Sequence, residues 1–424
     1  MAVLKLERGV GAGTAYFIEN EATIGRDASQ STIQICDQKA SRSHAKILKE
    51  ENHYYLEDLE SKNGTFLNGK PVTGKEALEP GDYIRIGFTW FYFCEDQEIE
   101  RISKQLPAYE ILQEIKRIGG SCLCFKVLQT GLGRMATLNL LPPNIIRKNP
   151  QLKERFRQQV RAFAKLNHEN ISIILDFDSK ESYLYFTTEY LEGETLASLL
   201  AKENKLSLEK TIEIGIGIAR ALNHAHNQHV IHQDVTPFNV GIGNRRVILG
   251  GFGLASVFDE IKDSFSGLIE KTEYLSPEQI QKQKIDQKSD IYSLGAILYE
   301  CLAGRPPFSG ENPEDIANFI LNDTAPAITM YNPNVPAEIE DMIYRCLEKD
   351  PAQRPENAEE IANKLEEVLL RYRVLELKNK PDIYTSGTVY YLLQILENPF
   401  FVWCFFPSLS LIFLAILSFM MYTK

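Results

Sequence analysis

Short runs of alternating hydrophobic and polar residues fill the first 97 positions of the chain. The clearest runs lie at residues 3–6, 32–35 and 82–87. They are separated by pairs that favour tight turns, namely Asn63-Gly64, Asn68-Gly69 and Pro80-Gly81. A period of two between turns is typical of strands with one buried face. Residues 1–97 are therefore predicted to form a small all-β sandwich.

The pattern changes beyond this segment. Residues 98–108 are mostly polar and include Pro107, so a linker is predicted there. Residues 109–189 contain strand-like runs around one helical segment at 151–166, whereas helical periodicity dominates residues 190–370. This order of elements predicts an α+β domain with two lobes, the first mainly strands and the second mainly helices.

The C-terminal end differs from everything before it. An amphipathic helix is predicted over residues 356–375, and no charged residue occurs from Asn398 through Thr423. Residues 400–422 are apolar on every face, and as a helix they would be about 35 Å long, against a hydrocarbon core of about 30 Å. A buried core helix, the alternative, would carry a polar stripe. A single transmembrane helix at 400–422 is therefore predicted, with 371–398 as the juxtamembrane segment.

Charges near the two ends indicate an orientation. Four cations precede the apolar stretch and one follows it; they are Arg371, Arg373, Lys378, Lys380 and Lys424. An excess of cations favours the cytoplasmic side, so the two folded domains are expected in the cytoplasm, held by a single-pass C-terminal anchor in the membrane. At the start of the chain, charges occupy positions where a signal peptide needs an apolar run, which predicts no export by that route.

Overall composition narrows the possible partners. The 424 residues carry 46 Lys+Arg against 57 Asp+Glu, a formal net charge of −11. A surface that binds nucleic acid is normally basic, so no nucleic-acid partner is expected. The seven cysteines are scattered along the chain, so neither a disulfide framework nor a zinc site is predicted.

Three loop sequences within the predicted sandwich offer groups that suit a phosphate. They are Gly25-Arg26, Ser41-Arg42-Ser43-His44 and Ser61-Lys62-Asn63-Gly64-Thr65. An arginine fork can bind two phosphate oxygens, Ser and Lys add a hydroxyl and a charge, and an Asn amide can hold a peptide backbone. Each sequence alone has an ordinary explanation, as a turn signal or a solvated charge. Their order and spacing together are specific.

Residues 1–97 resemble a forkhead-associated (FHA) domain, whose family pattern contains these three sequences in this order. By that resemblance, the phosphopeptide-binding residues would be Arg26, Ser41, Lys62 and Asn63. His44 would brace the loop that carries the serine. The resemblance implies a phosphothreonine-containing protein as partner, since clusters of cations are a recurrent way to recognise phosphorylated peptides. A purely structural sandwich is the alternative.

A second group of motifs lies within residues 109–370 and resembles a bacterial-type serine/threonine protein kinase. The matching segments are 232–239, which corresponds to the catalytic loop, then 276–278, 288–295 and 350–355. The resemblance implies a bilobal kinase fold with an N-terminal lobe at 109–189 and a C-terminal lobe at 190–370. It also implies an ion pair between Glu278 and Arg354, and it places Thr188 at the back of a nucleotide pocket.

Several positions depart from the kinase pattern. Asn139 stands where the phosphate-binding lysine belongs, Gln159 where its glutamate partner belongs, and Gly251 where the family has an aspartate that ligates Mg2+. Phosphoryl transfer depends on positioning and on neutralising charge. Amides and a glycine supply neither the cation nor the metal ligand. Asn139 and Gln159 are still expected to hydrogen-bond and to hold the helix that carries Gln159 in place.

Other catalytic positions are retained or altered. The glycine-rich segment 117–124 keeps two adjacent glycines but lacks the full Gly-x-Gly-x-x-Gly pattern. Asp234, at the proton-acceptor position, and Asn239, at the second metal-ligand position, remain. Both can equally serve to brace the catalytic loop. Activity would need a lysine from elsewhere, for which Lys126 is the nearest candidate because it follows Cys124 on the same face of a strand.

These observations favour a membrane-anchored signalling or scaffold protein that binds phosphothreonine peptides and carries a catalytically inactive kinase-like domain, a pseudokinase. The alternative is an active, atypical serine/threonine kinase that transfers phosphate from ATP to protein through Asp234 and Asn239. A third possibility, compatible with the first, is a domain that binds nucleotide without transferring phosphate. ATP and Mg2+ are accordingly expected as cofactors only if nucleotide binding is retained, and no metal-ligand set is predicted.

Overall fold

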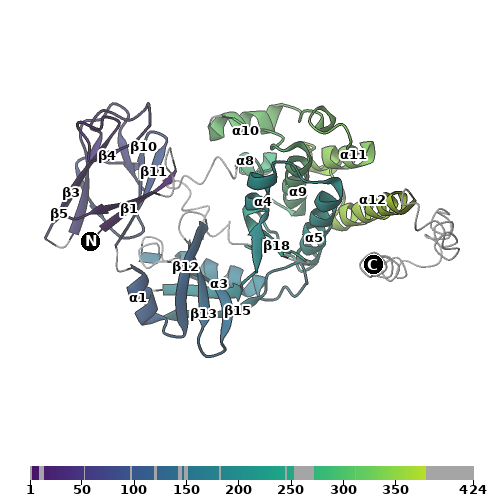
Figure 1. Ribbon diagram of the computed structural model, residues 1–424, viewed down its shortest axis with the longest axis horizontal. Helices are drawn as coiled ribbons and strands as arrows, with labels where there is room; N and C mark the ends of the chain where they lie inside the picture. Colours follow the sequence, from purple (N-terminus) through teal and green to yellow (C-terminus); the bar gives the residue numbers. More distant parts are fainter. Residues whose placement is uncertain are drawn as a thin grey trace.

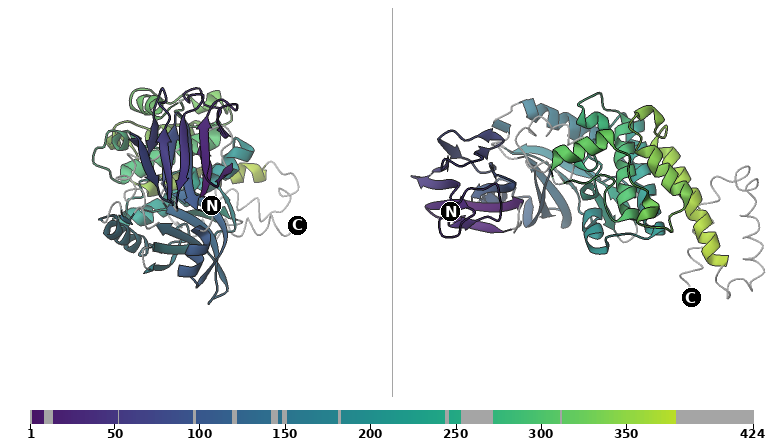
Figure 2. Two further views of the ribbon diagram at one scale, coloured as in Figure 1. Left: turned by 90° about the vertical axis from the view of Figure 1, so that its left-hand side faces the viewer. Right: turned by 90° about the horizontal axis from the view of Figure 1, so that it is seen from above.

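The chain folds into a β-sandwich followed by a β-rich lobe and a helical lobe (Figure 1). The computed structural model describes residues 2–378 except for 9–13, 52, 96–97, 119–121, 142–145, 148–150, 181–182, 244–245, 253–271 and 311. Seen from above, the sandwich lies at one end and helix α12 (Ala358–Lys378) at the other (Figure 2). The predicted all-β sandwich and two-lobed α+β domain are confirmed.

Two sheets make up the sandwich, with strand orders β2-β1-β11-β10-β7-β8 and β4-β3-β5-β6-β9. The strands are β1 (Ala2–Arg8), β2 (Ala15–Ile18), β3 (Glu21–Gly25), β4 (Ile33–Gln34), β5 (Ala45–Glu50), β6 (His53–Asp58), β7 (Thr65–Leu67), β8 (Lys70–Pro71), β9 (Lys75–Leu78), β10 (Tyr83–Ile86) and β11 (Thr89–Glu95). Because side chains alternate along each strand, Leu4, Ile24, Ile47 and Phe91 meet in a fully buried core. The Asn68-Gly69 turn between β7 and β8 has positive φ at both residues, 51° and 80°, as a tight hairpin turn requires.

The outer face of the first sheet is also buried. Val3, Tyr83, Tyr92 and Cys94 are 5% exposed or less, and they belong to the hydrophobic cluster that continues through the two lobes. At the edge of this contact, the Lys5 ammonium lies 2.6 Å from a carboxylate oxygen of Glu114 in the next domain. The sandwich therefore shares a packed surface with the domain that follows it. We call this surface the shared face.

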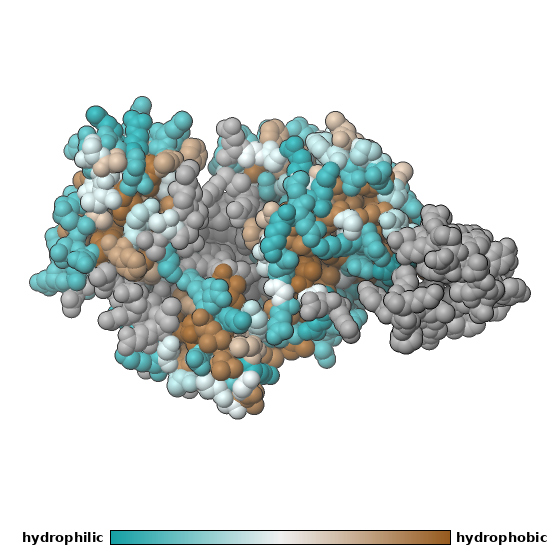
Figure 3. Space-filling model, in the orientation of Figure 1, coloured by the Kyte–Doolittle hydropathy of each residue, from teal (hydrophilic) through white to brown (hydrophobic). Residues whose placement is uncertain are grey.

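The β-rich lobe contains a five-stranded sheet of order β12-β13-β14-β16-β15. Its elements are α1 (Glu98–Gln105), β12 (Tyr109–Ile118), β13 (Cys122–Gln129), β14 (Arg134–Leu141), α3 (Gln151–Phe163), β15 (Ile174–Lys180) and β16 (Tyr183–Glu189). The segment 98–108, predicted as a linker, contains helix α1. Ile102 in this helix and Leu106, directly after it, are buried with residues of the sheet. On the face seen in Figure 3, hydrophobic residues gather over this lobe, whereas hydrophilic residues cover much of the sandwich.

Helices dominate the second lobe. Its elements are β17 (Gly193–Thr195), α4 (Leu196–Glu203), α5 (Leu208–Asn227), η1 (Pro237–Asn239), β18 (Val240–Gly243), β19 (Val247–Leu249), α8 (Pro277–Ile280), α9 (Gln287–Ala303), α10 (Pro313–Asn322), η3 (Ile328–Met330), α11 (Ala337–Cys346), η4 (Pro351–Gln353) and α12. Helix α12 packs along α5, where Arg373 donates hydrogen bonds to Glu209 at 2.8 Å and to Glu213 at 2.5 Å. The predicted juxtamembrane segment 371–398 thus begins inside a helix that belongs to this lobe.

A buried ion pair joins α8 to the loop before α12. The Arg354 guanidinium donates to both carboxylate oxygens of Glu278, at 2.7 and 2.9 Å. The pair predicted from the sequence is therefore confirmed. The predicted membrane segment, 400–422, lies outside the described residues. Within the described part of the chain, no helix combines the length and the apolar character needed to cross a membrane.

Candidate functional site

The structure places all four predicted phosphopeptide-binding residues on neighbouring loops of the sandwich. The Arg26 backbone N–H donates to the Ser41 carbonyl at 3.0 Å, and the Lys62 N–H donates to the Ser41 hydroxyl at 3.1 Å. The Asn63 amide donates to the Lys39 carbonyl at 2.6 Å. Arg26, Lys62 and Asn63 are exposed, so both cationic side chains are open to solvent on these neighbouring loops.

The His44 side chain connects two of these loops from the protein interior. Its ring is fully buried; Nδ1 accepts a hydrogen bond from the Ser41 N–H at 2.9 Å, and Nε2 donates to the Gly64 carbonyl at 3.2 Å. Burial lowers the pKa of His44, and the Gly64 carbonyl and the Asp58 carboxylate offset this only in part. The neutral ring therefore fits its two partners, and the bracing role predicted for His44 is confirmed.

Asp58 shapes the loop that carries Lys62 and Asn63, and sequence reasoning missed it. Its carboxylate accepts from the N–H and the hydroxyl of Ser61, both at 2.7 Å, and from the Thr65 hydroxyl at 2.5 Å. Burial raises the pKa of Asp58, but these hydrogen bonds outweigh burial and the pKa lies below its usual value. The sequence does contain a signal for this role, because Asp58 precedes Ser61 by three residues. An aspartate at this spacing favours hydrogen bonds between its side chain and the backbone.

His44 predicts a pH dependence of stability. Because its folded-state pKa lies below the ordinary value of about 6.5, the unfolded chain takes up the proton first, so stability is complete above this pH and falls as the pH drops below it. Thermal unfolding of the sandwich, followed between pH 7.5 and 5.5, should show this loss. A His44→Asn variant starts less stable but should show a smaller pH slope, and equal slopes in the two proteins would contradict the assignment.

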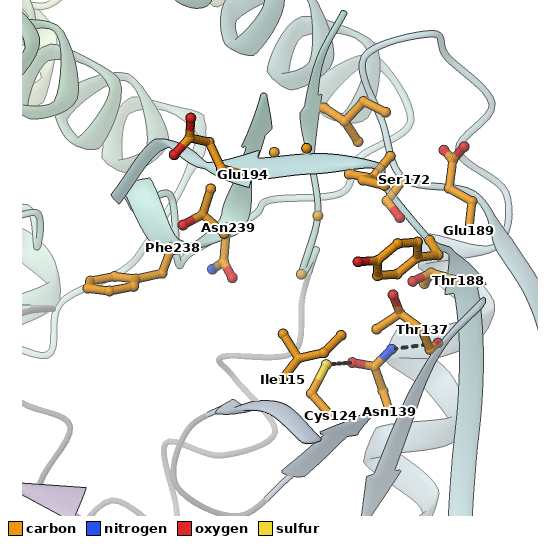
Figure 4. Close-up of a pocket in the computed structure, with 18 of the residues that line it drawn as sticks. Ile115, Cys124, Thr137, Asn139, Ser172, Thr188, Glu189, Glu194, Phe238 and Asn239 are labelled. Atoms are coloured by element: carbon orange, nitrogen blue, oxygen red, sulfur yellow. Dashed lines mark hydrogen bonds between the residues drawn. The ribbon is translucent and has the colours of Figure 1, made fainter. Parts of the chain in front are cut away.

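A cavity of about 300 Å3 lies between the two lobes (Figure 4). Thr188 closes its back, as the sequence predicts, and Tyr190 and Leu191 form the connection between the lobes along its edge. Asn139 lines the wall on the β-rich lobe, and Asn239 lines the opposite wall. The structure thus gathers several of the predicted kinase-like positions around one hollow.

Asn139 is folded back onto its own sheet and does not reach across the cavity. Its side chain is 3% exposed; Oδ1 accepts a hydrogen bond from the Cys124 thiol at 3.1 Å, and Nδ2 donates to the Thr137 carbonyl at 3.4 Å (Figure 4). Gln159 lies half-buried on α3. The expectation that these two amides would hold the helix by bonding to each other is wrong, because Asn139 uses its amide within the sheet.

Asp234 and Asn239, the two residues retained in the segment that resembles a catalytic loop, are hydrogen-bonded to each other. The Asn239 amide donates to the Asp234 backbone carbonyl at 2.8 Å and to its carboxylate at 2.9 Å. Gly251 has a φ of +83°, and a Cβ there would lie 3.3 Å from the Asn239 side chain. Across the described ranges, no group of three His, Cys, Asp or Glu side chains could hold a metal ion. The arrangement braces the loop and leaves position 251 without a ligand atom.

Lys126 lies away from the position of the missing lysine. On β13 it stands opposite Thr137, whereas Asn139 stands opposite Cys124. Its ammonium lies 4.3 Å from the centre of the Tyr190 ring, at the connection between the lobes. A cation over an aromatic face is attracted by the ring quadrupole. The Lys126 ammonium therefore lies at the edge of the cavity next to the interlobe connection, over Tyr190, and not at the position of Asn139.

A column of rings connects the lobes behind the cavity. Phe252 lies 5.6 Å from Phe163 of α3 and 4.4 Å from His232, measured between ring centres. Asp290 of α9 accepts the His232 backbone N–H at 2.8 Å, and His232 Nε2 bonds to the Gly250 carbonyl at 2.8 Å. Burial lowers the pKa of His232, which keeps this ring neutral. The three rings therefore pack together between α3 of the β-rich lobe and the loops of the helical lobe.

Two predicted features of the cleft lie outside the described residues. They are the glycine pair of the segment 117–124 and the segment that follows Phe252. The described geometry comprises a loop cluster with two exposed cations and a cleft lined by Asn139 and Gly251.

Two known families match this chain. A protein kinase domain matches residues 113–365, more than half of the chain, and an FHA domain matches residues 22–87. The first match covers the two lobes and the second covers the loops that carry Arg26, Ser41 and Asn63.

Curated relatives match mainly through the two lobes. A probable serine/threonine-protein kinase of Clostridium perfringens is 32% identical over 262 residues, which is 61% of this chain and 38% of the relative. One from Streptomyces coelicolor is 33% identical over 261 residues, with shares of 59% and 38%. Serine/threonine-protein kinase PrkC of Bacillus subtilis is 32% identical over 263 residues, with shares of 58% and 40%. The chain spans about two fifths of the length of these relatives.

A solved structure shares the order of the domains. The crystal structure of Rad53 1-466 in complex with AMP-PNP superposes with a TM-score of 0.52 at 21% identity, covering 86% of this chain and 98% of that chain. This likeness concerns the fold, a sandwich followed by two lobes.

Proposed function

The chain belongs to the protein kinase family and carries an FHA domain ahead of the kinase fold, and we propose that it is a signalling protein that recognises phosphothreonine. In this proposal its kinase fold acts as a binding module and does not transfer phosphate. The observation that carries this proposal is the contrast between its two sites. The loops of Arg26, Ser41 and Lys62 are joined by hydrogen bonds and leave the Arg26 and Lys62 side chains exposed, whereas the Asn139 amide is bonded within its sheet and Gly251 has no side chain.

An active serine/threonine kinase is the second candidate. The curated relatives are named as serine/threonine-protein kinases, and these names support activity more than they support its loss. The Asn239 amide also donates to the Asp234 carboxylate at 2.9 Å, within the segment that resembles a catalytic loop. The described residues of the cavity favour the first candidate, because none of them places a cation at Asn139 and the Lys126 ammonium lies over Tyr190, at the connection between the lobes.

Membrane attachment is a further part of the proposal. Its support is the uncharged stretch from Asn398 through Thr423, which contains enough apolar residues for one span. Helix α12, which precedes this stretch in the sequence, lies at the end of the molecule opposite the sandwich (Figure 2). The FHA and kinase folds are proposed to lie in the cytoplasm.

Measuring phosphate transfer from labelled ATP distinguishes the two candidate functions. We expect no transfer of phosphate to the chain itself or to a generic protein acceptor, with Mg2+ or Mn2+, above the level of an Asp234→Ala variant. One pre-organised group that stabilises a transition state is worth about 2.7–4 kcal/mol, and here more than one such group is replaced. Transfer that disappears in Asp234→Ala, with both proteins unfolding at the same temperature, would establish the active kinase instead.

A further inference from the structure

Phe88 is an exposed aromatic residue beside the phosphothreonine-reading loops. These loops carry the four residues Arg26, Ser41, Lys62 and Asn63. Phe88 is 58% exposed and lies in the turn between β10 and β11. The preceding Gly87 has a φ of +61°, and a Cβ there would lie 2.7 Å from the Lys39 side chain, so this turn packs closely against the segment that leads to Ser41. A single exposed apolar side chain is ordinary, and its surroundings decide whether it has a role.

The Asp37 carboxylate fixes this turn to the loop that leads to Ser41. Asp37 is 7% exposed. One of its oxygens accepts the Phe88 N–H at 2.7 Å and the Thr89 hydroxyl at 2.9 Å, and the other accepts the Lys39 N–H at 2.9 Å. A buried carboxylate is costly unless hydrogen bonds compensate for its lost hydration. The backbone of Phe88 is therefore held against the Lys39 segment, and little entropy is lost in ordering it when a ligand binds.

Lys39 connects this turn to the residue expected to hold a peptide backbone. The Lys39 carbonyl accepts the Asn63 amide at 2.6 Å. Lys39 also precedes Ser41 by two residues, and adjacent Cα atoms are about 3.8 Å apart, so these two Cα atoms are separated by no more than about 7.6 Å. An extended peptide advances about 3.3 Å per residue, so a peptide whose phosphothreonine lies at Ser41 reaches the Phe88 side chain within about four residues.

The charges around Phe88 limit the kind of residue that can pack on it. The ammonium groups of Lys39 and Lys62 are exposed on these loops, and they disfavour a basic residue in their neighbourhood. The face of an aromatic ring carries partial negative charge, which disfavours a carboxylate on the ring itself. A bulky, uncharged apolar residue meets both conditions, and removing its surface from water against Phe88 is favourable.

We propose that the sandwich selects phosphothreonine peptides in which a bulky aliphatic or aromatic residue, within about four residues of the phosphothreonine, packs on Phe88. This inference rests on the proposed function, because it specifies which peptides the phosphothreonine site accepts. Arg26 and Ser41 would hold the phosphate, which all such peptides share. Phe88 would supply the difference of affinities on which specificity depends.

Fluorescence anisotropy of the full chain in a mild detergent tests this proposal, with labelled phosphothreonine peptides that vary one flanking position at a time. We expect Leu, Met or Phe at one position within about four residues of the phosphothreonine to bind about tenfold more tightly than Ala there, because the contact buries much of a large apolar side chain. The absence of such a position, or a preference for charged residues at every position in this range, would overturn the proposal.

Substitution of Phe88 locates the contact. Phe88→Ala should reduce the preference to less than about twofold, and Phe88→Leu should retain most of it, because leucine restores the apolar surface. Both variants keep the hydrogen bond to Asp37, which comes from the backbone N–H. Phe17→Ala is the matched control, since Phe17 is 64% exposed on the edge strand β2 of the same sandwich. An undiminished preference in Phe88→Ala, or an equal loss in Phe17→Ala, would refute the role of Phe88.

The failure of this inference differs from that of the proposed function. Phosphothreonine peptides that bind with equal affinity whatever residues flank the phosphothreonine would overturn selection by Phe88 alone. Peptides that bind no better with the phosphate than without it would overturn the phosphothreonine site itself, and this inference with it.

Discussion

Replacing Arg26 by alanine should remove binding of a phosphothreonine peptide. Arg26 is exposed beside Ser41 and Lys62 at the mouth of the loop cluster, and a guanidinium can donate two parallel hydrogen bonds to a phosphate. Each hydrogen bond to a charged group is worth about 1.5–3 kcal/mol, so affinity should fall at least about a hundredfold if both are lost. The affinity can be measured by fluorescence anisotropy with a library of labelled phosphothreonine peptides, and the unphosphorylated peptides serve as blanks.

Arg42→Ala is the matched control for this result. Arg42 is an exposed arginine in the same loop sequence, and its backbone carbonyl, rather than its side chain, holds the Ser31 hydroxyl at 2.9 Å. Its loss removes one positive charge from the same neighbourhood without touching the proposed phosphate fork. Equal losses of affinity in the two variants would mean that the loops attract phosphate by general charge, and would contradict the specific role of Arg26.

Replacing Arg354 by alanine should destabilise the helical lobe by about 3–5 kcal/mol, because it leaves a buried carboxylate without its partner. The Arg354 side chain is fully buried and donates to Glu278 and to the backbone carbonyls of Lys288, Glu348 and Lys349. Burial raises the pKa of Glu278, but hydrogen bonds from Arg354 and Ser289 outweigh burial and keep this pKa below its ordinary value. Hydrogen exchange of α8 and α9 amides should reveal the loss.

Two further variants separate the causes of this effect. Arg354→Lys keeps the charge but loses the fork, so an intermediate loss of stability is expected. Lys364→Ala removes a half-exposed ammonium that pairs with Glu338 and Glu367 at the surface, and surface pairs contribute only about 0–1 kcal/mol. If Arg354→Ala changes exchange no more than Lys364→Ala does, the buried pair is not the stabilising element.

The sequence was sufficient for features that depend on local chemistry. Alternation and Asn-Gly pairs located the sandwich, because strand periodicity and positive φ are local demands on each residue. The family resemblance likewise implied that His44 braces the loops, and its hydrogen bonds to Ser41 and Gly64 agree with this role. The partner of Arg354 was predictable because both members of the pair belong to recognisable motifs.

Features decided by distant packing were not predictable in the same way. Residues 98–108 look polar in sequence, and only the sheet shows why Ile102 and Leu106 are buried. The register of β13 against β14 decides that the Asn139 amide meets Cys124 rather than Gln159. The same register places Lys126 at the connection between the lobes. A sequence pattern gives the face of a strand but not which residue stands opposite.

Packing across the shared face holds the sandwich in one orientation relative to the lobes. Val3, Tyr83 and Tyr92 are buried in it, and the pair of Lys5 and Glu114 lies at its edge. A client protein caught by the phosphothreonine-reading loops would consequently be presented to the lobes in one direction, at a high local concentration. Selection of clients would then depend on where along their surface the phosphorylated residue lies, as well as on the amino acids that flank it.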